Sequence, residues 1–403
     1  MSDPTILVAA RNEEEHIGET VASLRRDFPG AEILVADGRS EDATAVCAEN
    51  AGAVVLRLTR RGKGEALSAG ERAATPGPLL LCDADLRGSL RPLVDGSDSD
   101  LAVARFVRPS GGGFGIAKRA ARLLIWARTG YRAAEPLSGQ RYVSERARAA
   151  CFPLAPGFGC EVRMTIDALR AGLGIQEVTV DLDHRATGRD PAGFLHRGRQ
   201  LVDALLAAGP LAVNHRGLRL PLVGWTVGVQ RDPGVTAVML LGFLDDVRAG
   251  EERGFRSHLR AGRTTGVLKL VGIPLVGLLR TRSPSGALLV GLAANLANQL
   301  DTKPGRCLKA YLAAAVLLRG PLVPGVLLLP YDLRERVMLG DAGSNALGAL
   351  LGLKSVERFH GWGRWAAIGT LAGLNILGER TSLGGLIERT PALRGLDRLG
   401  RAR

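Results

Sequence analysis

The sequence predicts two domains: a doubly wound α/β domain over residues 1–208, and an all-α, multi-pass membrane domain over residues 209–403. Short apolar runs alternate with amphipathic segments in the first half, which is typical of a parallel sheet covered by helices. From Leu220 on, apolar segments become longer and richer in glycine, after a Gly-Pro pair at 209–210. The length of 403 residues also fits two domains.

The first half contains four apolar runs that predict buried strands, at residues 6–10, 32–36, 53–58 and 79–85. Between them, apolar residues recur at helical spacing over Glu13–Phe28, Asp42–Ala51 and Lys63–Ala74. In a doubly wound sheet, ligands bind beyond the carboxyl ends of the strands. The functional residues of this half are therefore expected directly after the apolar runs.

The second half has one uncharged run of 18 residues, Ser283–Leu300. Five other apolar segments are shorter or interrupted by Arg, Lys or Pro: 220–230, 233–244, 265–279, 310–330 and 365–378. A spanning helix needs about 20 mostly apolar residues. Small residues at helical spacing, such as Gly286 and Ala297, suit close packing in lipid. We expect an integral membrane domain; the alternative is a soluble helical domain with a very apolar core.

The formal net charge is +13, yet only six of the 53 basic residues are lysine. No basic block with interleaved aromatics occurs, so a nucleic-acid partner is not expected. Coding bias toward Arg, Gly and Ala explains part of the charge. The arginine-rich stretch 248–263 also suits a cytoplasmic loop that faces anionic lipid and diphosphate donors. Five dispersed cysteines indicate a reducing compartment, so the N-terminal domain is expected on the cytoplasmic side.

Carboxylates follow three of the predicted strands. The first run leads into Arg11 and three glutamates from Glu13 on, and the second ends at Asp37. The fourth ends in Asp83-Ala84-Asp85, a spacing that lets two carboxylates hold a hard divalent cation. Each pattern alone also fits a solvated turn after a strand. Three of them at one edge of a sheet indicate a site for a charged ligand.

These blocks, ARNEEEHIGETVASL, EILVADGRSEDATA, RRGKGEAL and LLLCDADL, occur in the order found in family 2 glycosyltransferases, which have the GT-A fold. Residues 3–205 resemble that family. Two later blocks, 136–141 and 157–161, resemble its glucosyl-3-phosphoglycerate synthase and dolichyl-phosphate glucosyltransferase branch. The block at 183–190 does so too.

The resemblance implies a role for each matching residue. Glu13 and Asp37 would contact the base and ribose of a nucleoside-diphosphate sugar, with Lys63 near the nucleotide. Asp83 and Asp85 would hold Mg²⁺ or Mn²⁺, with His184 as a late ligand that favours Mn²⁺. The other residues assigned to the nucleotide sugar are Arg11, Asp83, Gly139, Gln140 and Arg141. Glu161 is the candidate base for a hydroxyl acceptor, although a carboxylate there also suits a helix N-terminus.

The second half carries a second set of carboxylates, Asp245, Asp246, Asp301 and Asp341. Their motifs resemble the polyprenyl-phosphate N-acetylhexosamine-1-phosphate transferases, membrane enzymes that use Mg²⁺. The resemblance implies catalytic roles for Asp245, Asp246 and Asp301, and metal binding by Asp245, Asp246 and Asp341. The scaffold before the Asp pair is shorter than in that superfamily, and its late His-X-His loop is missing. A degenerate domain kept for anchoring or lipid docking is therefore an equal alternative.

The combined interpretation is a metal-dependent inverting glycosyltransferase at the cell membrane. Its acceptor would be polyprenyl phosphate or a lipid-linked glycan, in envelope glycan assembly. One alternative is a bifunctional enzyme whose C-terminal half transfers HexNAc-1-phosphate to undecaprenyl phosphate. Another is a non-catalytic scaffold that binds nucleotide sugar and membrane.

Overall fold

The computed structural model describes residues 3–96, 98–107, 115–182, 191–229, 232–248 and 264–401, without the side chains of 191–197 and 264–267. These residues form two compact units. The α/β unit comprises Met1–Gly209 with Gly217–Arg219, and the helical unit comprises Pro210–Arg216 with Leu220–Arg403. The expected limits of the two functional domains, residues 1–208 and 209–403, stay a prediction.

The α/β unit contains a seven-stranded sheet in the order β3-β2-β1-β4-β6-β5-β7. The first four strands in this order are parallel, and β6 runs antiparallel to both of its neighbours. The strands are β1 (Thr5–Ala10), β2 (Ile33–Asp37), β3 (Val54–Arg57), β4 (Leu79–Asp83), β5 (Leu101–Phe106), β6 (Arg141–Val143) and β7 (Ile175–Val180). The predicted α/β fold is confirmed, because all four predicted strands form.

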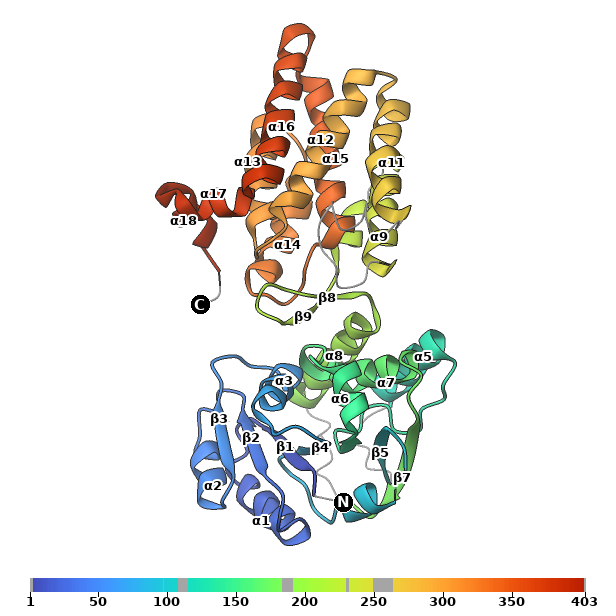
Figure 1. Cartoon of the computed structure of the whole chain (residues 1–403), viewed down its shortest axis with the longest axis vertical. Coiled ribbons are helices and arrows are strands. Elements are labelled where there is room, and N and C mark those ends of the chain that lie inside the picture. Colours follow the sequence, from blue (N-terminus) through green and yellow to red (C-terminus); the bar gives the residue numbers. More distant parts are fainter. Residues whose placement is uncertain are drawn as a thin grey trace. The chain divides into compact units, whose positions relative to one another are not determined.

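Helices cover both faces of this sheet (Figure 1). They are α1 (Ile17–Asp27), α2 (Thr44–Asn50), α3 (Lys63–Ala73), α4 (Arg91–Asp95), α5 (Ile116–Thr129), α6 (Glu145–Cys151), α7 (Cys160–Arg170) and α8 (Pro191–Ala208), with a 3-10 turn at Gly157–Gly159. The first three match the predicted helices. α1 starts four residues later than expected, because Glu13 to His16 form a turn in which the Glu13 carbonyl accepts from the His16 and Ile17 N–H groups.

The two faces of the sheet belong to two separate apolar clusters. Ile6 and Val8 of β1 pack with α1, whereas Leu7 packs with α3, α6 and α7 on the opposite face. Successive strand residues point to opposite faces, and both faces here are covered by helices. This explains why β1, β2 and β4 read as continuous apolar runs. The carboxyl ends of these strands are left as the polar edge of the sheet.

The helical unit follows two short strands, β8 (Leu211–Val213) and β9 (Arg219–Pro221), which pair with each other. Its helices form a bundle with two short helices beside it (Figure 1). They are α9 (Pro233–Arg248), α11 (Thr264–Thr281), α12 (Pro284–Leu300), α13 (Arg306–Leu318), α14 (Val323–Leu333), α15 (Gly340–Arg358), α16 (Gly361–Thr381), α17 (Leu383–Arg389) and α18 (Pro391–Arg398), with a 3-10 turn at Gly224–Gly228. The prediction that this half is helical is confirmed for the described residues, which also include the short strands β8 and β9.

Small residues bring three of these helices into close contact. A Cβ added to Gly348 of α15 would lie 2.4 Å from the Ala293 carbonyl oxygen of α12. A Cβ added to Gly291 of α12 would lie 2.9 Å from the Pro274 ring of α11. The small residues of this half therefore serve close helix packing, as expected from their spacing.

No helix in the described part of the chain is both long enough and apolar enough to cross a membrane. The longest uncharged run forms α12, whose 17 residues span about 26 Å, less than the roughly 30 Å of a bilayer core. The expectation of a multi-pass membrane domain is therefore not supported. The arginine-rich loop expected at 248–263 lies outside the described residues except for Arg248, the last residue of α9.

Candidate active site

The candidate site of the α/β unit lies at the carboxyl ends of β1, β2 and β4. In the parallel register, Ala10 pairs with Asp37, and Ala9 pairs with Asp83. Asp37 and Asp83 are the last residues of their strands, so they flank the end of β1 on either side. The structure thus brings together the three blocks that the sequence singled out.

The loops that follow β1 and β2 are joined to each other by hydrogen bonds. The Asn12 N–H donates to Ser40 Oγ at 2.9 Å, and the Glu41 N–H donates to Asn12 Oδ1 at 2.9 Å. The Glu13 N–H donates to Thr44 Oγ1 at 2.7 Å. Asn12 has a positive φ of 54°, a conformation that asparagine tolerates better than most residues. These bonds fix the two loops as one wall of the site.

Asp37 stabilises this wall through hydrogen bonds with Ser40. Its carboxylate accepts the Ser40 N–H at 3.0 Å and also the Ser40 hydroxyl, and the residue is buried. Arg11, at the start of the same region, is exposed. The contacts of Asp37, Glu13 and Arg11 with a nucleotide sugar stay predictions.

An ion-pair cluster around Lys63, the first residue of α3, forms the centre of the site. Lys63 Nζ lies 2.6 Å from Asp83 Oδ1 and 2.7 Å from Glu161 Oε1. Gln140 Nε2 donates to the other oxygen of Asp83 at 3.2 Å, and Cys160 Sγ donates to Glu161 Oε2 at 3.0 Å. We call Lys63, Asp83, Gln140 and Glu161 the Lys63 cluster. Four predicted residues from separate sequence blocks therefore meet at one place.

Burial and charge act in opposite directions on Lys63. Burial by itself lowers the pKa of the ammonium, but the Asp83 and Glu161 carboxylates outweigh it and raise the pKa well above the usual range. The lysine therefore keeps its charge at physiological pH. Two carboxylates against one ammonium leave the cluster with an excess negative charge. Such a cluster is suited to a further cation.

Gly139 leaves space for the ends of the Asp83 and Lys63 side chains in this cluster. A Cβ at this position would lie 2.4 Å from Asp83 Oδ2 and 2.6 Å from Lys63 Nζ. Real Cβ atoms essentially never approach other heavy atoms so closely. Any side chain here would push Asp83 and Lys63 apart.

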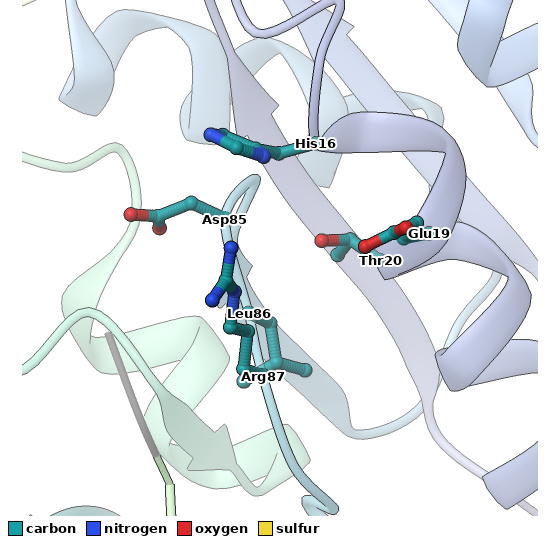
Figure 2. A pocket seen from close by; sticks show the side chains of 6 residues that line it. All are labelled: His16, Glu19, Thr20, Asp85, Leu86 and Arg87. Carbon is teal, nitrogen blue, oxygen red and sulfur yellow. The ribbon is translucent and has the colours of Figure 1, made fainter. Parts of the chain in front are cut away.

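Asp85 lies two residues beyond β4 and faces a different part of the site. It lines a small cavity with His16, Glu19, Thr20, Leu86 and Arg87. Figure 2 shows these side chains, which come from α1 with the residue before it and from the loop after β4. The Thr20 hydroxyl donates to the Ala84 carbonyl at 2.8 Å and ties α1 to that loop.

Asp83 and Asp85 are both accessible enough to bind a metal ion. Asp83 keeps 32% of its side chain exposed despite its contact with Lys63, and Asp85 borders an open cavity. Both can offer oxygen ligands, the type that Mg²⁺ and Mn²⁺ prefer. Among the described residues, no group of three or more His, Cys, Asp or Glu forms a metal site. His184, the expected third ligand, lies outside these residues.

The contact of Arg141 with the nucleotide sugar stays a prediction, and the structure places this residue inside the domain. Its residue is only 1% exposed, and its guanidinium donates to the Ser138 and Pro136 carbonyls and to Thr165 Oγ1. These bonds hold the loop that carries Gly139 and Gln140 against α7. Arg141 therefore stabilises the loop before β6 from inside the domain.

The segment before Glu161 is fixed by two further carboxylates. The Gly157 N–H donates to Glu65 Oε2 of α3 at 3.0 Å, and the Phe158 N–H donates to Asp203 Oδ2 of α8 at 3.0 Å. Burial raises the pKa of Glu65. Sequence reasoning did not identify Glu65 or Asp203, since a single acidic residue within a helix carries no distinctive pattern.

In the helical unit, Asp245, Asp246 and Asp341 also come together, around Lys269. Lys269 Nζ lies 2.5 Å from Asp245 Oδ2 and forms an ion pair with Asp341 as well. Asp246 accepts the Asp341 N–H at 2.8 Å and the Ala342 N–H at 2.9 Å, at the start of α15. We call these four residues the Lys269 cluster. Lys269 was not predicted as a site residue, because a lone lysine in an apolar run suggests only a helix interruption.

Packing and burial shape the chemistry of this second cluster. Gly340 has a positive φ of 65°, which favours glycine, and a Cβ there would lie 2.9 Å from both Asp246 carboxylate oxygens. Burial and the nearby Asp341 carboxylate raise the pKa of Asp246 to about 7. Asp301 follows the last residue of α12, and the contacts described for the cluster do not include it. The predicted catalytic and metal-binding roles of these residues stay predictions.

Comparison with known proteins bears on the α/β unit. Residues 5–137 match the family model for Glycosyl transferase family 2. The N-terminal half contains a family 2 glycosyltransferase domain. The protein is a glycosyltransferase enzyme, so the alternative of a non-catalytic scaffold is wrong.

Curated relatives resemble the same half of the chain. Glucosyl-3-phosphoglycerate synthase of Mycolicibacterium paratuberculosis is 29% identical over 237 residues, covering 50% of this chain and 71% of the relative. Glycosyltransferase AglJ of Haloferax volcanii is 28% identical over 200 residues, covering 46% of this chain and 64% of that protein.

Two solved structures match about half of this chain. The crystal structure of Mycobacterium tuberculosis glucosyl-3-phosphoglycerate synthase is 27% identical and matches 51% of this chain and 80% of that chain, with a TM-score of 0.43. A complex of that enzyme with Mn²⁺, UDP-glucose and phosphoglyceric acid is 25% identical over 55% of this chain and 86% of the other, also with a TM-score of 0.43.

Proposed function

We propose that the protein transfers a sugar from a nucleoside-diphosphate donor, UDP-sugar in the first instance, to a phosphate-bearing acceptor with inversion at the anomeric carbon. The Lys63 cluster at the carboxyl ends of β1, β2 and β4 is the observation that carries this proposal. The curated relatives named glucosyl-3-phosphoglycerate synthase support the donor chemistry and the acceptor class.

The donor would bind over the wall formed by the loops after β1 and β2. Lys63 places an ammonium beside Asp83, where it can neutralise the negative charge that develops on the departing diphosphate. Asp83 and Asp85 would hold Mg²⁺ or Mn²⁺, with His184 as an additional candidate. When bound, such an ion stabilises charge on the diphosphate oxygens as a Lewis acid.

Glu161 is the proposed base on the acceptor side. Its carboxylate is buried in the first turn of α7 and held by Lys63 and the Cys160 thiol. For a hydroxyl acceptor, Glu161 would take the proton as the oxygen attacks the anomeric carbon. An acceptor that attacks through an ionised phosphate oxygen needs no base.

The need for a base distinguishes the two candidate classes of acceptor. Phosphoglycerate would attack through a hydroxyl, whereas undecaprenyl phosphate would attack through its phosphate. We expect Glu161→Gln to lower kcat about 100-fold or more with phosphoglycerate and to change it little with undecaprenyl phosphate. Release of UDP from UDP-glucose and from UDP-GlcNAc would be measured with each acceptor. Release of GDP from GDP-mannose would be measured in the same way.

The matched control is Glu145→Gln, which changes an exposed glutamate in the first turn of α6 and should keep wild-type rates. Chelation of divalent cations should abolish transfer. Wild-type transfer by Asp85→Ala would contradict the metal assignment, and absence of transfer from every donor to both acceptors would contradict the proposed function.

A second activity is proposed for the helical unit on the strength of the Lys269 cluster. The cluster gathers carboxylates from α9 and α15 around one ammonium, as an anionic donor with a divalent cation would require. The activity would be transfer of HexNAc-1-phosphate to undecaprenyl phosphate. It releases UMP, whereas glycosyl transfer releases UDP. UMP formation lost in Asp245→Asn but retained in Glu161→Gln would support it; absence of UMP from wild-type protein would contradict it.

We further propose that the protein works at the cytoplasmic face of the cell membrane. Apolar side chains on the surface of the helical unit support this placement, including Leu399 at 70% and Trp362 at 89% exposure. Exposed apolar surface of this kind marks contact with lipid or protein.

A further inference from the structure

The two last described helices, α17 and α18, lie beside the helix bundle rather than within it (Figure 1). α18 is exposed at every residue except Asp397. Its leucines are not covered: Leu396 is 64% exposed, and Leu399, directly after the helix, is 70% exposed. An isolated exposed leucine is ordinary, but several on one short helix form an apolar face.

The sequence of α18 separates this apolar face from a basic one. Leu393 and Leu396 are three residues apart and therefore share a face, which Leu399 extends. Arg394 and Arg398 are four residues apart and share another face, and both are exposed. A helix with an apolar face and arginines on the opposite, polar face is the pattern of a segment that lies in a membrane interface.

Asp397, on a third side of the helix, fastens α18 to the bundle. Its carboxylate accepts two hydrogen bonds from Arg306 of α13, at 2.9 and 3.0 Å. Lys309 of α13 donates to the carbonyl oxygens of Leu396, Asp397 and Leu399, at 3.0, 2.7 and 2.6 Å. These bonds satisfy the carbonyls at the end of the helix and fix which side faces outward. The leucine face is therefore held outward by a buried ion pair.

We infer that α17 and α18 form a docking element for an anionic lipid surface, with leucines inserted between headgroups and arginines on the phosphates. Arg389, Arg394 and Arg398 supply exposed positive charge around the apolar face, complementary to anionic lipid. A stable interface between two copies buries about 800 Å² per partner and has few charges at its centre. A helix of eight residues with two exposed arginines is a poor match for such an interface.

The element deepens the proposal of a membrane-bound enzyme and rests on it. It would keep the enzyme at the surface where a lipid-linked acceptor resides. It requires no helix to cross the bilayer.

The test uses the full-length protein and flotation with vesicles of phosphatidylcholine alone or with about one-third phosphatidylglycerol. Wild-type protein should bind the anionic vesicles more tightly than the neutral ones. The double variant Arg394→Gln/Arg398→Gln should weaken binding to anionic vesicles by about 25-fold, at roughly fivefold for each arginine. Leu396→Ser/Leu399→Ser should weaken it by a similar factor. All four positions are exposed, so these changes leave the fold intact.

Matched controls change residues of the same types elsewhere in the helical unit. Leu317→Ser removes an even more exposed leucine at the end of α13, and Arg358→Gln removes an exposed arginine at the end of α15. Both should bind vesicles as the wild type does. Equal losses in the controls and in the α18 variants would overturn the assignment to α18.

A local readout identifies what covers the leucines. An environment-sensitive fluorophore on Leu399→Cys, in a Cys47→Ser background, should shift its emission to the blue only when anionic vesicles are added. No shift on vesicle binding would contradict the inference, and a shift that depends on protein concentration without vesicles would show that a second copy covers this face. The same variants should release UDP at the wild-type rate when phosphoglycerate is the acceptor. Loss of vesicle binding with retained transfer therefore separates this inference from the proposed function.

Discussion

Lys63 shows how one residue organises the candidate site of the glycosyltransferase domain. Its ammonium holds a carboxylate from the end of β4 and another from the first turn of α7. A buried charge is tolerated only when it is paired, and removing one member leaves the others uncompensated. Lys63 is therefore expected to support both donor binding and the position of the proposed base.

Gly139 offers the sharpest test at this scale, because a single Cβ would collide with Asp83 and Lys63. Gly139→Ala should displace both side chains and lower kcat/KM for UDP-sugar by about 100-fold. Steady-state kinetics with UDP-glucose would measure the effect.

Gly18 provides the control for this substitution. It lies in α1, and nothing lies within 4 Å of where its Cβ would be. Gly18→Ala should keep wild-type kinetics. Wild-type activity in Gly139→Ala would mean that the Lys63 cluster is not part of the catalytic site.

At the scale of elements, buried side chains decide how neighbouring segments are joined. Arg141 fastens the loop before β6 to α7, and Asp332 near the end of α14 accepts the Gly305 N–H before α13 at 2.7 Å. Burial raises the pKa of Asp332 to about 6, against an ordinary value of 3.8. The folded state therefore binds a proton more tightly at this site than the unfolded state does.

The sign of the resulting pH dependence follows from linkage. Between about pH 4 and pH 6 the folded state keeps the proton on Asp332 while the unfolded state has lost it, so this group makes the free energy of unfolding fall as pH rises. Above about pH 6 the contribution is constant. Asp332→Asn removes this ionisation, so its stability relative to wild type should rise across that window, by no more than about 3 kcal/mol.

Urea unfolding followed by tryptophan fluorescence would measure this difference, since Trp225, Trp362 and Trp365 lie in the helical unit. Glu357→Gln, which changes a side chain 64% exposed on α15, should show a constant offset from the wild type. A constant offset for Asp332→Asn as well would show that Asp332 is not responsible.

At the scale of the whole molecule, two compact units carry two separate clusters of charge. The family 2 domain and the Lys63 cluster belong to the α/β unit, whereas the Lys269 cluster belongs to the helical unit. A ligand that binds only one unit should stabilise that unit.

We expect calorimetry to show two unfolding transitions, and UDP with Mn²⁺ should raise the transition of the α/β unit. At 100 times its Kd, a ligand adds about 2.7 kcal/mol to the stability of the unit that binds it. Asp83→Asn should reduce this shift, and Asp245→Asn should leave it unchanged. An equal shift of both transitions would show that the units unfold as one or that both bind the nucleotide.

The sequence by itself determined the α/β fold of the first half, because strand and helix periodicities are local and both faces of the sheet must be apolar. It also identified Lys63, Asp83, Gln140 and Glu161 from short motifs, and placed Asp37 and Asp83 at one edge, because parallel strands end together. It predicted helices in the second half, but the length of an apolar run does not show where each helix ends. The helices of the described residues end too soon, or carry too many charges, to cross a membrane.

Only the tertiary structure decided which of these residues meet. The pairing of Lys63 with Glu161, the burial of Arg141 and the entry of Lys269 between Asp245 and Asp341 join segments distant in sequence. Local sequence patterns carry no information on such contacts. They do not show whether a charged side chain faces solvent or another charge in the folded protein. The anchoring of α18 through Arg306 and Asp397 is of the same kind: the amphipathic pattern is local, but the side that faces outward is set by a distant ion pair.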